Sequence, residues 1–240
     1  MNLKEGIYNL RKELYENGKE VKTMMWQGIE NPPEFLEILH ANIIMDMEQT
    51  IEGAVEMCDP WLPWADDHFQ ERIGGEPLNP PPSHRYWLKD TEEFFSDNEK
   101  FSHSYPERFW SKGLHRGIRF EIGDYNTLLE VIKKDPQTRQ AYLPIYFPED
   151  LGASAIGERI PCTLGYQVII RDNELNIFYP MRSCDVLRHL HNDIYFANLL
   201  AIDIKEKCGL DVKIGKLHFV ATSLHCFTND RYPLKKKLGI

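Results

Sequence analysis

Three residues in the second half of the chain have types suited to covalent chemistry on a phosphorylated substrate. Cys162 begins an apolar stretch typical of a strand, and Arg182 and Ser183 close the next such stretch. The dipeptide Asp172-Asn173 between the two stretches indicates a hairpin, which would bring Cys162 and Arg182 side by side. A guanidinium beside a thiol favours the thiolate, which is the form that attacks electrophilic carbon. Arg182 with Ser183 also offers a fork of donors and a hydroxyl for phosphate.

The 240-residue chain carries 28 basic and 37 acidic side chains, a formal net charge of −9. This acidity argues against nucleic acid and anionic membranes as partners, although a few arginines can still bind a small anion. We expect a cytoplasmic protein, because no stretch reaches the ~18 apolar residues of a membrane span and the first residues lack a signal-peptide core. The five cysteines form no C-x-x-C pair, so the sequence predicts neither a disulfide framework nor a zinc site.

The elements that must position these residues do not alternate in a strict βαβ order. Apolar spacing, caps and Gly/Pro breaks predict helices at 2–17, about 33–58, 125–134 and 185–207. Strands are predicted at 140–147, 162–171, 174–182 and 213–219, the last continuing as extended chain to about 227. The stretch 59–116 is expected to be mostly irregular, with tryptophans that either form one wall of a cleft or anchor its loops to the core. We therefore expect one α/β (α+β) domain, residues 1–240, around a mixed sheet.

The residues that follow Cys162 at fixed distances carry a family resemblance. Gln167, Arg182, Asp185 and Asp193 lie five, twenty, twenty-three and thirty-one positions after it. Together with the proline before the cysteine, this spacing resembles the thymidylate synthase family.

Two flanking segments extend the resemblance over roughly residues 124–230. Asp135–Arg139 resembles the family's phosphate-binding arginine segment, and His225–Asn229 resembles its sugar-binding segment. The resemblance implies a thymidylate synthase-like fold, with a large mixed sheet flanked by helices and a homodimer joined sheet to sheet. Each active site of that dimer would borrow Arg139 from the partner chain. The implied substrate is a pyrimidine nucleoside monophosphate, and the implied co-substrate is 5,10-methylenetetrahydrofolate.

The resemblance also implies roles for individual residues. Cys162 is the nucleophile, and Glu71 is favoured as the general base, with Asp67 as the alternative. Trp87 and Trp110 are the expected contacts for the folate. The substrate is expected to be bound by a set of polar side chains, in which Lys22 stands in for an N-terminal phosphate arginine: Arg182, Ser183, Arg139, Gln167, His225, Asp185 and Lys22.

Asp193 departs from the family, which has asparagine at this position to read uracil. Cytosine offers an amino donor and a ring-nitrogen acceptor where uracil offers the reverse. A carboxyl group can accept from that amino group and, when protonated, donate to N3. The same change marks the cytidylate hydroxymethylase branch of the superfamily, so we expect dCMP as the substrate. CMP stays open because Phe227 replaces the family's sugar-binding tyrosine.

Three functions remain open on these residues. The favoured one is a dCMP 5-hydroxymethylase, in which water completes the hydroxymethyl group. If the cleft excludes water, the folate can deliver hydride instead and the product is a 5-methyl nucleotide. The third is a non-catalytic nucleotide-binding regulator. An enzyme acting on free cytidylate suits a phage, with the host cytoplasm as its location, or a nucleoside-antibiotic pathway.

No metal is expected at this site. His189 and His191 lie two residues apart on a predicted helix and therefore point about 200° away from each other, so they cannot chelate one ion. The pair His68 and Glu71 is too sparse for a zinc site.

Overall fold

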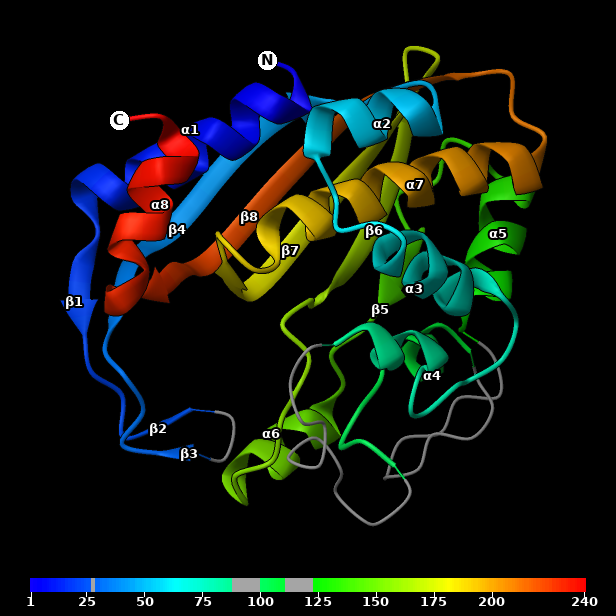
Figure 1. The fold of residues 1–240 in the computed structure, drawn as a ribbon. Helices are drawn as coiled ribbons and strands as arrows, with labels where there is room; N and C mark the ends of the chain where they lie inside the picture. The colour runs from blue at the N-terminus through cyan, green and yellow to red at the C-terminus, as the bar shows by residue number, and fades with distance from the viewer. Residues whose placement is uncertain (27–28, 88–99, 111–122) are drawn as a thin grey trace.

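A six-stranded mixed sheet forms the centre of this computed structural model, which describes residues 1–26, 29–87, 100–110 and 123–240 (Figure 1). The strand order is β1-β4-β8-β7-β6-β5, and only β7 and β8 among these described neighbours run parallel. The mixed α/β class predicted from the sequence is confirmed. The strands of the sheet are β1 (Lys19–Val21), β4 (Phe35–Asp46), β5 (Tyr142–Pro144), β6 (Gly165–Arg171), β7 (Glu174–Asp185) and β8 (Lys213–Phe227). A separate two-stranded ribbon consists of β2 (Met25–Trp26) and β3 (Ile29–Glu30).

The predicted hairpin joins β6 to β7. Asp172 and Asn173 have φ values of 51° and 61°, the left-handed backbone that a tight two-residue turn requires, and both residue types tolerate it. Arg171 pairs with Glu174 directly beside the turn. At the other end of the hairpin β6 begins at Gly165, three residues later than predicted, and a single bridge continues the pairing to Thr163. The hairpin therefore fixes Cys162 opposite the last residues of β7.

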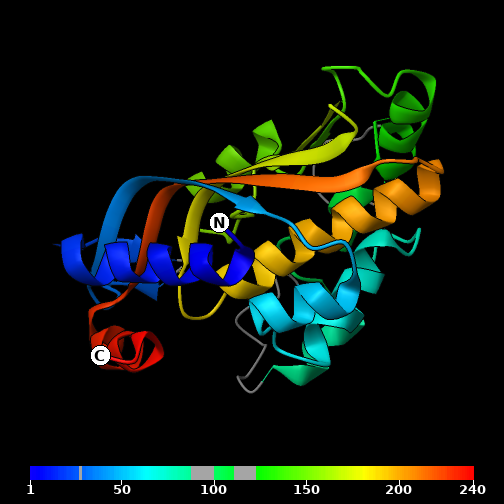
Figure 2. The same cartoon turned by 90° about the horizontal axis from the view of Figure 1, so that it is seen from above.

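Helices α1 and α7 cover one face of the sheet, and α2 and α3 lie beside α7 (Figures 1 and 2). The long α7 is buried along most of its length, which explains its apolar run from Ile194 to Ile202, broken only at Asn198. Within the described ranges, the helices lack the length or the apolarity to cross a bilayer. The helices are α1 (Leu3–Asn17), α2 (Ile51–Cys58), α3 (Trp64–Ile73), η1 (Pro82–Tyr86), α4 (Pro106–Phe109), α5 (Tyr125–Lys134), α6 (Pro148–Ala155), α7 (Leu190–Cys208), η3 (Thr228–Asp230) and α8 (Arg231–Leu238).

The predicted helix over 33–58 is wrong in its first half, which is strand β4. Leu36 faces the core before His40, whereas Ala41 and Met45 face it afterwards, so the inward positions change from even to odd numbers. His40 has a left-handed φ of 60°, and it interrupts the pairing with β8 at this point. This change of phase removes the strict alternation by which a strand is identified from sequence.

The stretch 59–116 contains more regular structure than predicted. It holds α3, the short 3-10 helix η1 and α4. Asn79 fixes the loop between α3 and α4, because its side chain exchanges hydrogen bonds with the backbone of Phe101 and donates to Glu107. A buried bidentate ion pair between Arg108 and Asp150, at 2.8 and 3.0 Å, then joins α4 to α6.

Candidate active site

The hairpin brings the candidate nucleophile and the two phosphate-type ligands together. The Sγ of Cys162 lies 3.5 Å from Ser183 Oγ and 3.7 Å from Arg182 Nη2. The guanidinium of Arg182 is held in place by the carbonyls of Pro161 and Ile160, to which it donates at 2.8 and 3.1 Å. A thiol with a fixed cation beside it is arranged for nucleophilic attack.

Hydroxyl groups surround the backbone directly after Cys162. Thr163 is fully buried, and its Oγ1 lies 2.9 Å from the hydroxyl of Tyr179. The backbone N–H of Thr163 donates to the hydroxyl of Tyr105 at 3.5 Å. Burial raises the pKa of both tyrosines, so they stay neutral donors. The backbone beside the candidate nucleophile is therefore held by hydroxyl groups that carry no charge.

Asp193 is a buried carboxyl in the first turn of α7, with 9% of its surface exposed. Burial raises its pKa to about 7, against the opposing charge of Arg72 and a hydrogen bond at 3.8 Å from Cys184 Sγ. Ser183 contacts Cys162 at 3.5 Å, and the next residue of β7, Cys184, contacts Asp193 at 3.8 Å. The end of β7 therefore contacts both the thiol of Cys162 and the carboxyl of Asp193.

Asp185 organises the turn between β7 and α7. Its Oδ1 accepts from the backbone N–H groups of Leu187 and Arg188 at 2.8 and 2.9 Å, and its Oδ2 accepts from the Arg188 guanidinium at 3.0 Å. In the parallel register Asp185 is paired with His225 on β8. Burial lowers the pKa of His225, partly opposed by Asp185, so the imidazole is neutral and can accept or donate a hydrogen bond.

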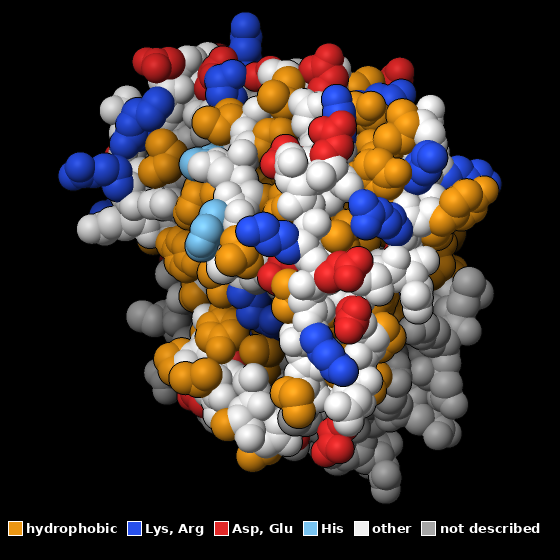
Figure 3. All heavy atoms as spheres, turned by 90° about the vertical axis from the view of Figure 1, so that its left-hand side faces the viewer, with side chains coloured by type: hydrophobic (Ala, Val, Ile, Leu, Met, Phe, Trp, Pro, Cys, Tyr) orange, Lys and Arg blue, Asp and Glu red, His pale blue; other side chains and the backbone are white. Residues whose placement is uncertain are grey.

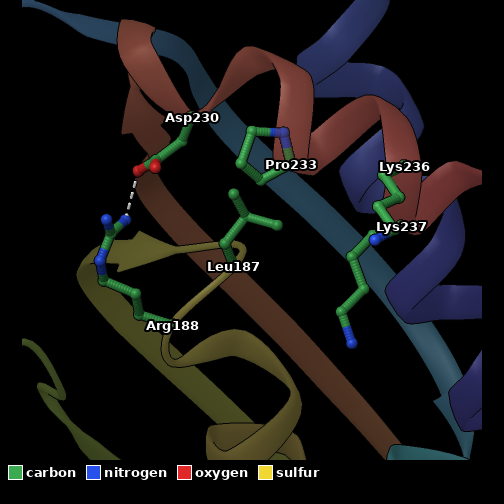
Figure 4. A pocket seen from close by; sticks show the side chains of 6 residues that line it. All are labelled: Leu187, Arg188, Asp230, Pro233, Lys236 and Lys237. Carbon is green, nitrogen blue, oxygen red and sulfur yellow. Dashed lines mark hydrogen bonds and ion pairs between the residues drawn. The ribbon is translucent and has the colours of Figure 1, made fainter. Parts of the chain in front are cut away.

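Arg188 also closes one side of a groove of about 520 Å³ between this turn and α8 (Figure 4). It forms an ion pair at 2.5 Å with Asp230, so Asp185, Arg188 and Asp230 make one chain of charges. The basic run 235–237 belongs to α8, and its lysines are exposed. The groove is lined by Leu187, Arg188, Asp230, Pro233, Lys236 and Lys237. Basic and acidic side chains are interspersed over the side of the molecule that carries α8 (Figure 3).

Glu71, the favoured general base, lies on α3 and accepts three hydrogen bonds. Its oxygens accept from the backbone N–H and the Oγ of Ser83 at 2.5 and 2.6 Å, and from His68 Nδ1 at 3.4 Å. Burial alone would raise the pKa of Glu71, but the hydrogen bonds from His68 and Ser83 outweigh burial and lower it. Glu71 is therefore ionised and anchored to η1. The alternative base, Asp67, is half-buried, forms an ion pair with Arg85 and accepts from the hydroxyl of Tyr86.

The two candidate folate contacts differ in accessibility. Trp87 is half-buried at the end of η1, and its ring stacks on Phe101 with centroids 5.9 Å apart. Trp110 is only 6% exposed, and its indole N–H donates to the backbone carbonyl of Arg72 at 2.9 Å. This environment is typical of a core tryptophan, so Trp87 is the better placed of the two for a ligand.

Three of the predicted substrate ligands, Gln167, Arg139 and Lys22, do not join the Cys162 cluster within this chain. This cluster consists of Cys162, Arg182 and Ser183. Gln167 donates to the backbone carbonyl of Arg139 at 3.1 Å, between β6 and the segment before β5. The side chain of Arg139 is exposed, and Lys22 is exposed between β1 and β2. In the described ranges, none of these three has a hydrogen bond or ion pair with the Cys162 cluster.

Sequence reasoning missed three residues of this region, namely Arg72, Tyr105 and Arg188. Arg72 directly follows Glu71 and lies one helical turn after His68, but a buried arginine has no periodic signal that separates it from a surface one. Tyr105 and Arg188 acquire their roles from contacts between distant elements. Among the residues that the structure describes, no group of three His, Cys, Asp or Glu side chains is arranged to hold a metal ion.

Comparison with known proteins gives the same family for the chain. A match to the thymidylate synthase family covers residues 82–239. Among the relatives, the deoxyuridylate hydroxymethyltransferase of Bacillus phage SP01 is 30% identical over 148 residues, which are 59% of this chain and 38% of the relative. The thymidylate synthase of Buchnera aphidicola is 26% identical over 117 residues, 49% of this chain and 42% of that protein. The chain thus spans about two fifths of the length of these relatives.

A solved structure shows the same fold. The thermostable thymidylate synthase A from Bacillus subtilis superposes with a TM-score of 0.67 at 17% identity, covering 100% of this chain and 84% of that one. The family match extends from η1 to α8 and includes the hairpin, the first turn of α7 and the end of β8. The chain belongs to the thymidylate synthase family.

Proposed function

We propose that this chain, as one catalytic domain, adds a hydroxymethyl group to C5 of a cytidylate, with dCMP as the favoured substrate. One observation carries the proposal: the Cys162 thiol contacts Arg182 and Ser183 at the end of β7, where the adjacent Cys184 contacts the buried Asp193. The group of Cys162, Arg182 and Ser183 can bind a phosphate and attack carbon, and the carboxyl of Asp193 can bind a pyrimidine edge.

In the proposed reaction Cys162 forms and later breaks one bond. Its Sγ adds to C6 of the pyrimidine, which makes C5 a carbon nucleophile, and it leaves C6 when the product ring is restored. Methylenetetrahydrofolate supplies the one-carbon unit, and Trp87 is the residue that we propose for contact with it. Glu71 is ionised and can accept a proton from C5 or from the water that completes the hydroxymethyl group.

The phosphate and the sugar are assigned to residues around the hairpin. Arg182 and Ser183 bind the phosphate, helped by Arg139 from a partner chain and by Lys22. Gln167, Asp185 and His225 bind the pyrimidine edge and the sugar. The parallel pairing of Asp185 with His225 supports this assignment, because it puts both at the same end of the sheet.

Asp193 is the proposed reader of the base. With a pKa of about 7, both of its forms are populated near neutral pH. The ionised form accepts from the cytosine amino group, and the protonated form can also donate to N3. The phage relative is named for deoxyuridylate, so the base must be tested directly.

A second candidate is a reductive C5-methyltransferase, which the Buchnera relative, named a thymidylate synthase, favours. The name of the phage relative favours hydroxymethyl transfer. The two reactions differ in product mass and in whether dihydrofolate absorbance appears. A nucleotide-binding regulator would give neither product, and the arrangement around Cys162 argues against it.

We also propose the sheet-to-sheet homodimer. On the face of the sheet opposite α1 and α7, no described helix covers β4 and β8 (Figure 2). Leu39 and Ile44 on that face are 61% and 51% exposed, which is unusual for large apolar side chains of a sheet. A second copy packed there would bury them and could supply Arg139 across the interface.

The test is an assay of dCMP, CMP and dUMP with methylenetetrahydrofolate, read by mass spectrometry. We expect a hydroxymethyl product from dCMP and release of tritium from [5-³H]dCMP. Cys162→Ala should abolish both while dCMP still binds, because Arg182 and Asp193 remain. Cys208→Ala is the matched control, since Cys208 is a half-buried thiol at the end of α7. Full activity of Cys162→Ala would refute the mechanism.

A further inference from the structure

Three polar side chains on β4 and β8 form a connected group next to the end of β7. Glu37 on β4 lies directly opposite His225 on β8, and Ser223 lies two residues before His225. Ser223 Oγ donates to Glu37 Oε1 at 2.5 Å and lies 3.4 Å from His225 Nδ1. Ser223 is paired in turn with Ser183 on β7, whose hydroxyl contacts the thiol of Cys162. The group therefore lies one strand away from the candidate nucleophile.

The count of protons in this group decides the form of the imidazole. A carboxylate only accepts hydrogen bonds, and a hydroxyl has one proton to donate. Since Ser223 donates that proton to Glu37, its oxygen can only accept from His225. Nδ1 of His225 must then carry the ring proton, and in a neutral imidazole this leaves Nε2 as an acceptor.

The surroundings of His225 keep the ring neutral. Burial is the largest cause that lowers the pKa of His225, and the charge of Arg182 acts in the same direction. The carboxylates of Asp185 and Glu37 and a hydrogen bond with the backbone of Ser223 act against it. Together they leave the pKa of His225 below its ordinary value, so the imidazole carries one proton at neutral pH.

The other groups around His225 leave its Nδ1 to Ser223. Asp185, which is paired with His225 on the other side, directs its oxygens at the turn after β7. Phe35 packs its ring edge-on against the imidazole, with centroids 5.3 Å apart. Within the described ranges, Ser223 is the residue whose side chain forms a hydrogen bond with a ring nitrogen of His225. Glu37 is therefore the group that decides where the Ser223 proton points.

Resting on the proposed function, we propose that Glu37 is a positioning residue, which acts through Ser223 to hold the ring proton of His225 on Nδ1, so that Nε2 accepts from the sugar. The sugar of dCMP has one free hydroxyl, at C3′, because C5′ carries the phosphate. An acceptor at Nε2 requires this hydroxyl to donate, so a substituent that can only accept binds less well. Without the Glu37 carboxylate, the Ser223 proton can turn to Nδ1 and the ring proton moves to Nε2.

The position of the ring proton can be measured without any nucleotide. Two-bond ¹H–¹⁵N correlation spectra of protein labelled with ¹⁵N-histidine distinguish protonated from unprotonated ring nitrogens, at pH ~8 where the ring is neutral. The signals of His225 are those lost in His225→Gln. Glu37→Met keeps the length of the side chain and removes the acceptor, and Ser223→Ala removes the hydroxyl. Glu20→Met is the matched control, because Glu20 is an exposed glutamate on β1.

We expect the proton of His225 on Nδ1 in the native protein and in Glu20→Met. Glu37→Met and Ser223→Ala should each lower the ratio of the Nδ1–H form to the Nε2–H form, by roughly tenfold for the loss of one hydrogen bond. In the Ser223→Ala background, Glu37→Met should have no further effect, because the connection between Glu37 and His225 is already broken. A ratio that stays native in Glu37→Met, or that Glu37→Met still changes without Ser223, would overturn the inference.

Nucleotide binding gives a second readout. The native protein should bind dCMP about tenfold more tightly than the analogue with fluorine in place of the 3′-hydroxyl, because fluorine cannot donate. Glu37→Met should reduce this preference severalfold, and Glu20→Met should leave it unchanged. An unchanged preference in Glu37→Met would also overturn the inference. A ring proton that moves as expected in a protein that binds no cytidylate would overturn the proposed function instead, because the spectra require no nucleotide.

Discussion

The buried carboxyl of Asp193 makes the stability of the protein depend on pH in a direction opposite to that of most carboxyls. Its pKa is about 7 in the folded protein, against an ordinary value of 3.8. Between these two values the folded state holds a proton that the unfolded chain has lost, so stability falls as pH rises. At 1.36 kcal/mol per pH unit, the full difference corresponds to about 4 kcal/mol above pH ~7.

The perturbation is Asp193→Asn, which keeps the size of the side chain and removes its ionisation. Denaturant unfolding of both proteins from pH ~4 to ~9 should show that the variant gains stability over the native protein as pH rises, by up to about 4 kcal/mol. Asp211→Asn is the control, because Asp211 is exposed. If the two stability curves run parallel across this range, Asp193 does not titrate as the structure indicates, and the reasoning on base reading fails with it.

Two further predictions concern the other proposed roles. Glu71→Gln should lower turnover by a factor of roughly 10²–10⁴ while the KM for the nucleotide stays close to native, as expected for a general base. If Glu71→Gln instead keeps its turnover and loses thermal stability, and Ser83→Ala loses stability in the same way, then Glu71 only anchors η1. Arg139→Ala and Cys162→Ala should each be inactive, but mixed hybrids of the two should regain activity, because one site of each hybrid then has a native cysteine and a native partner arginine. Hybrids as inactive as their parents would contradict the shared site.

The sequence predicts well those elements whose signals are local. Asp124 caps α5 by accepting from Thr127 N, and Gly209 ends α7 in a left-handed conformation, both as their residue types indicated. The turn at 172–173 follows from two residues that tolerate positive φ. Because this hairpin sets the position of Cys162 opposite Arg182, the central cluster of the candidate site was predictable from the sequence.

Elements that depend on distant partners were not predictable. Strand β4 was mistaken for a helix because its core-facing positions change from even to odd numbers at His40 while its register with β8 is kept, and no local pattern reveals such a change. Arg72 lies on a helix that the sequence did not predict, and its environment comes from Tyr105 and Phe196, far away in the chain. The neutral tyrosines around Asp193 likewise belong to separate strands and loops. Sequence spacing therefore gives the proposed nucleophile and its proposed phosphate ligands, while the electrostatics around Asp193 require the fold.

The apolar side chains Leu39 and Ile44 on the open face of the sheet would, in the proposed dimer, link activity to abundance. If a second copy must cover this face and lend Arg139, a dilute solution holds mostly single chains with incomplete sites. Specific activity would then rise with protein concentration instead of staying constant, and a cell that makes few copies would have almost none. The number of molecules made would thus act as an on–off control on the modification of free nucleotides.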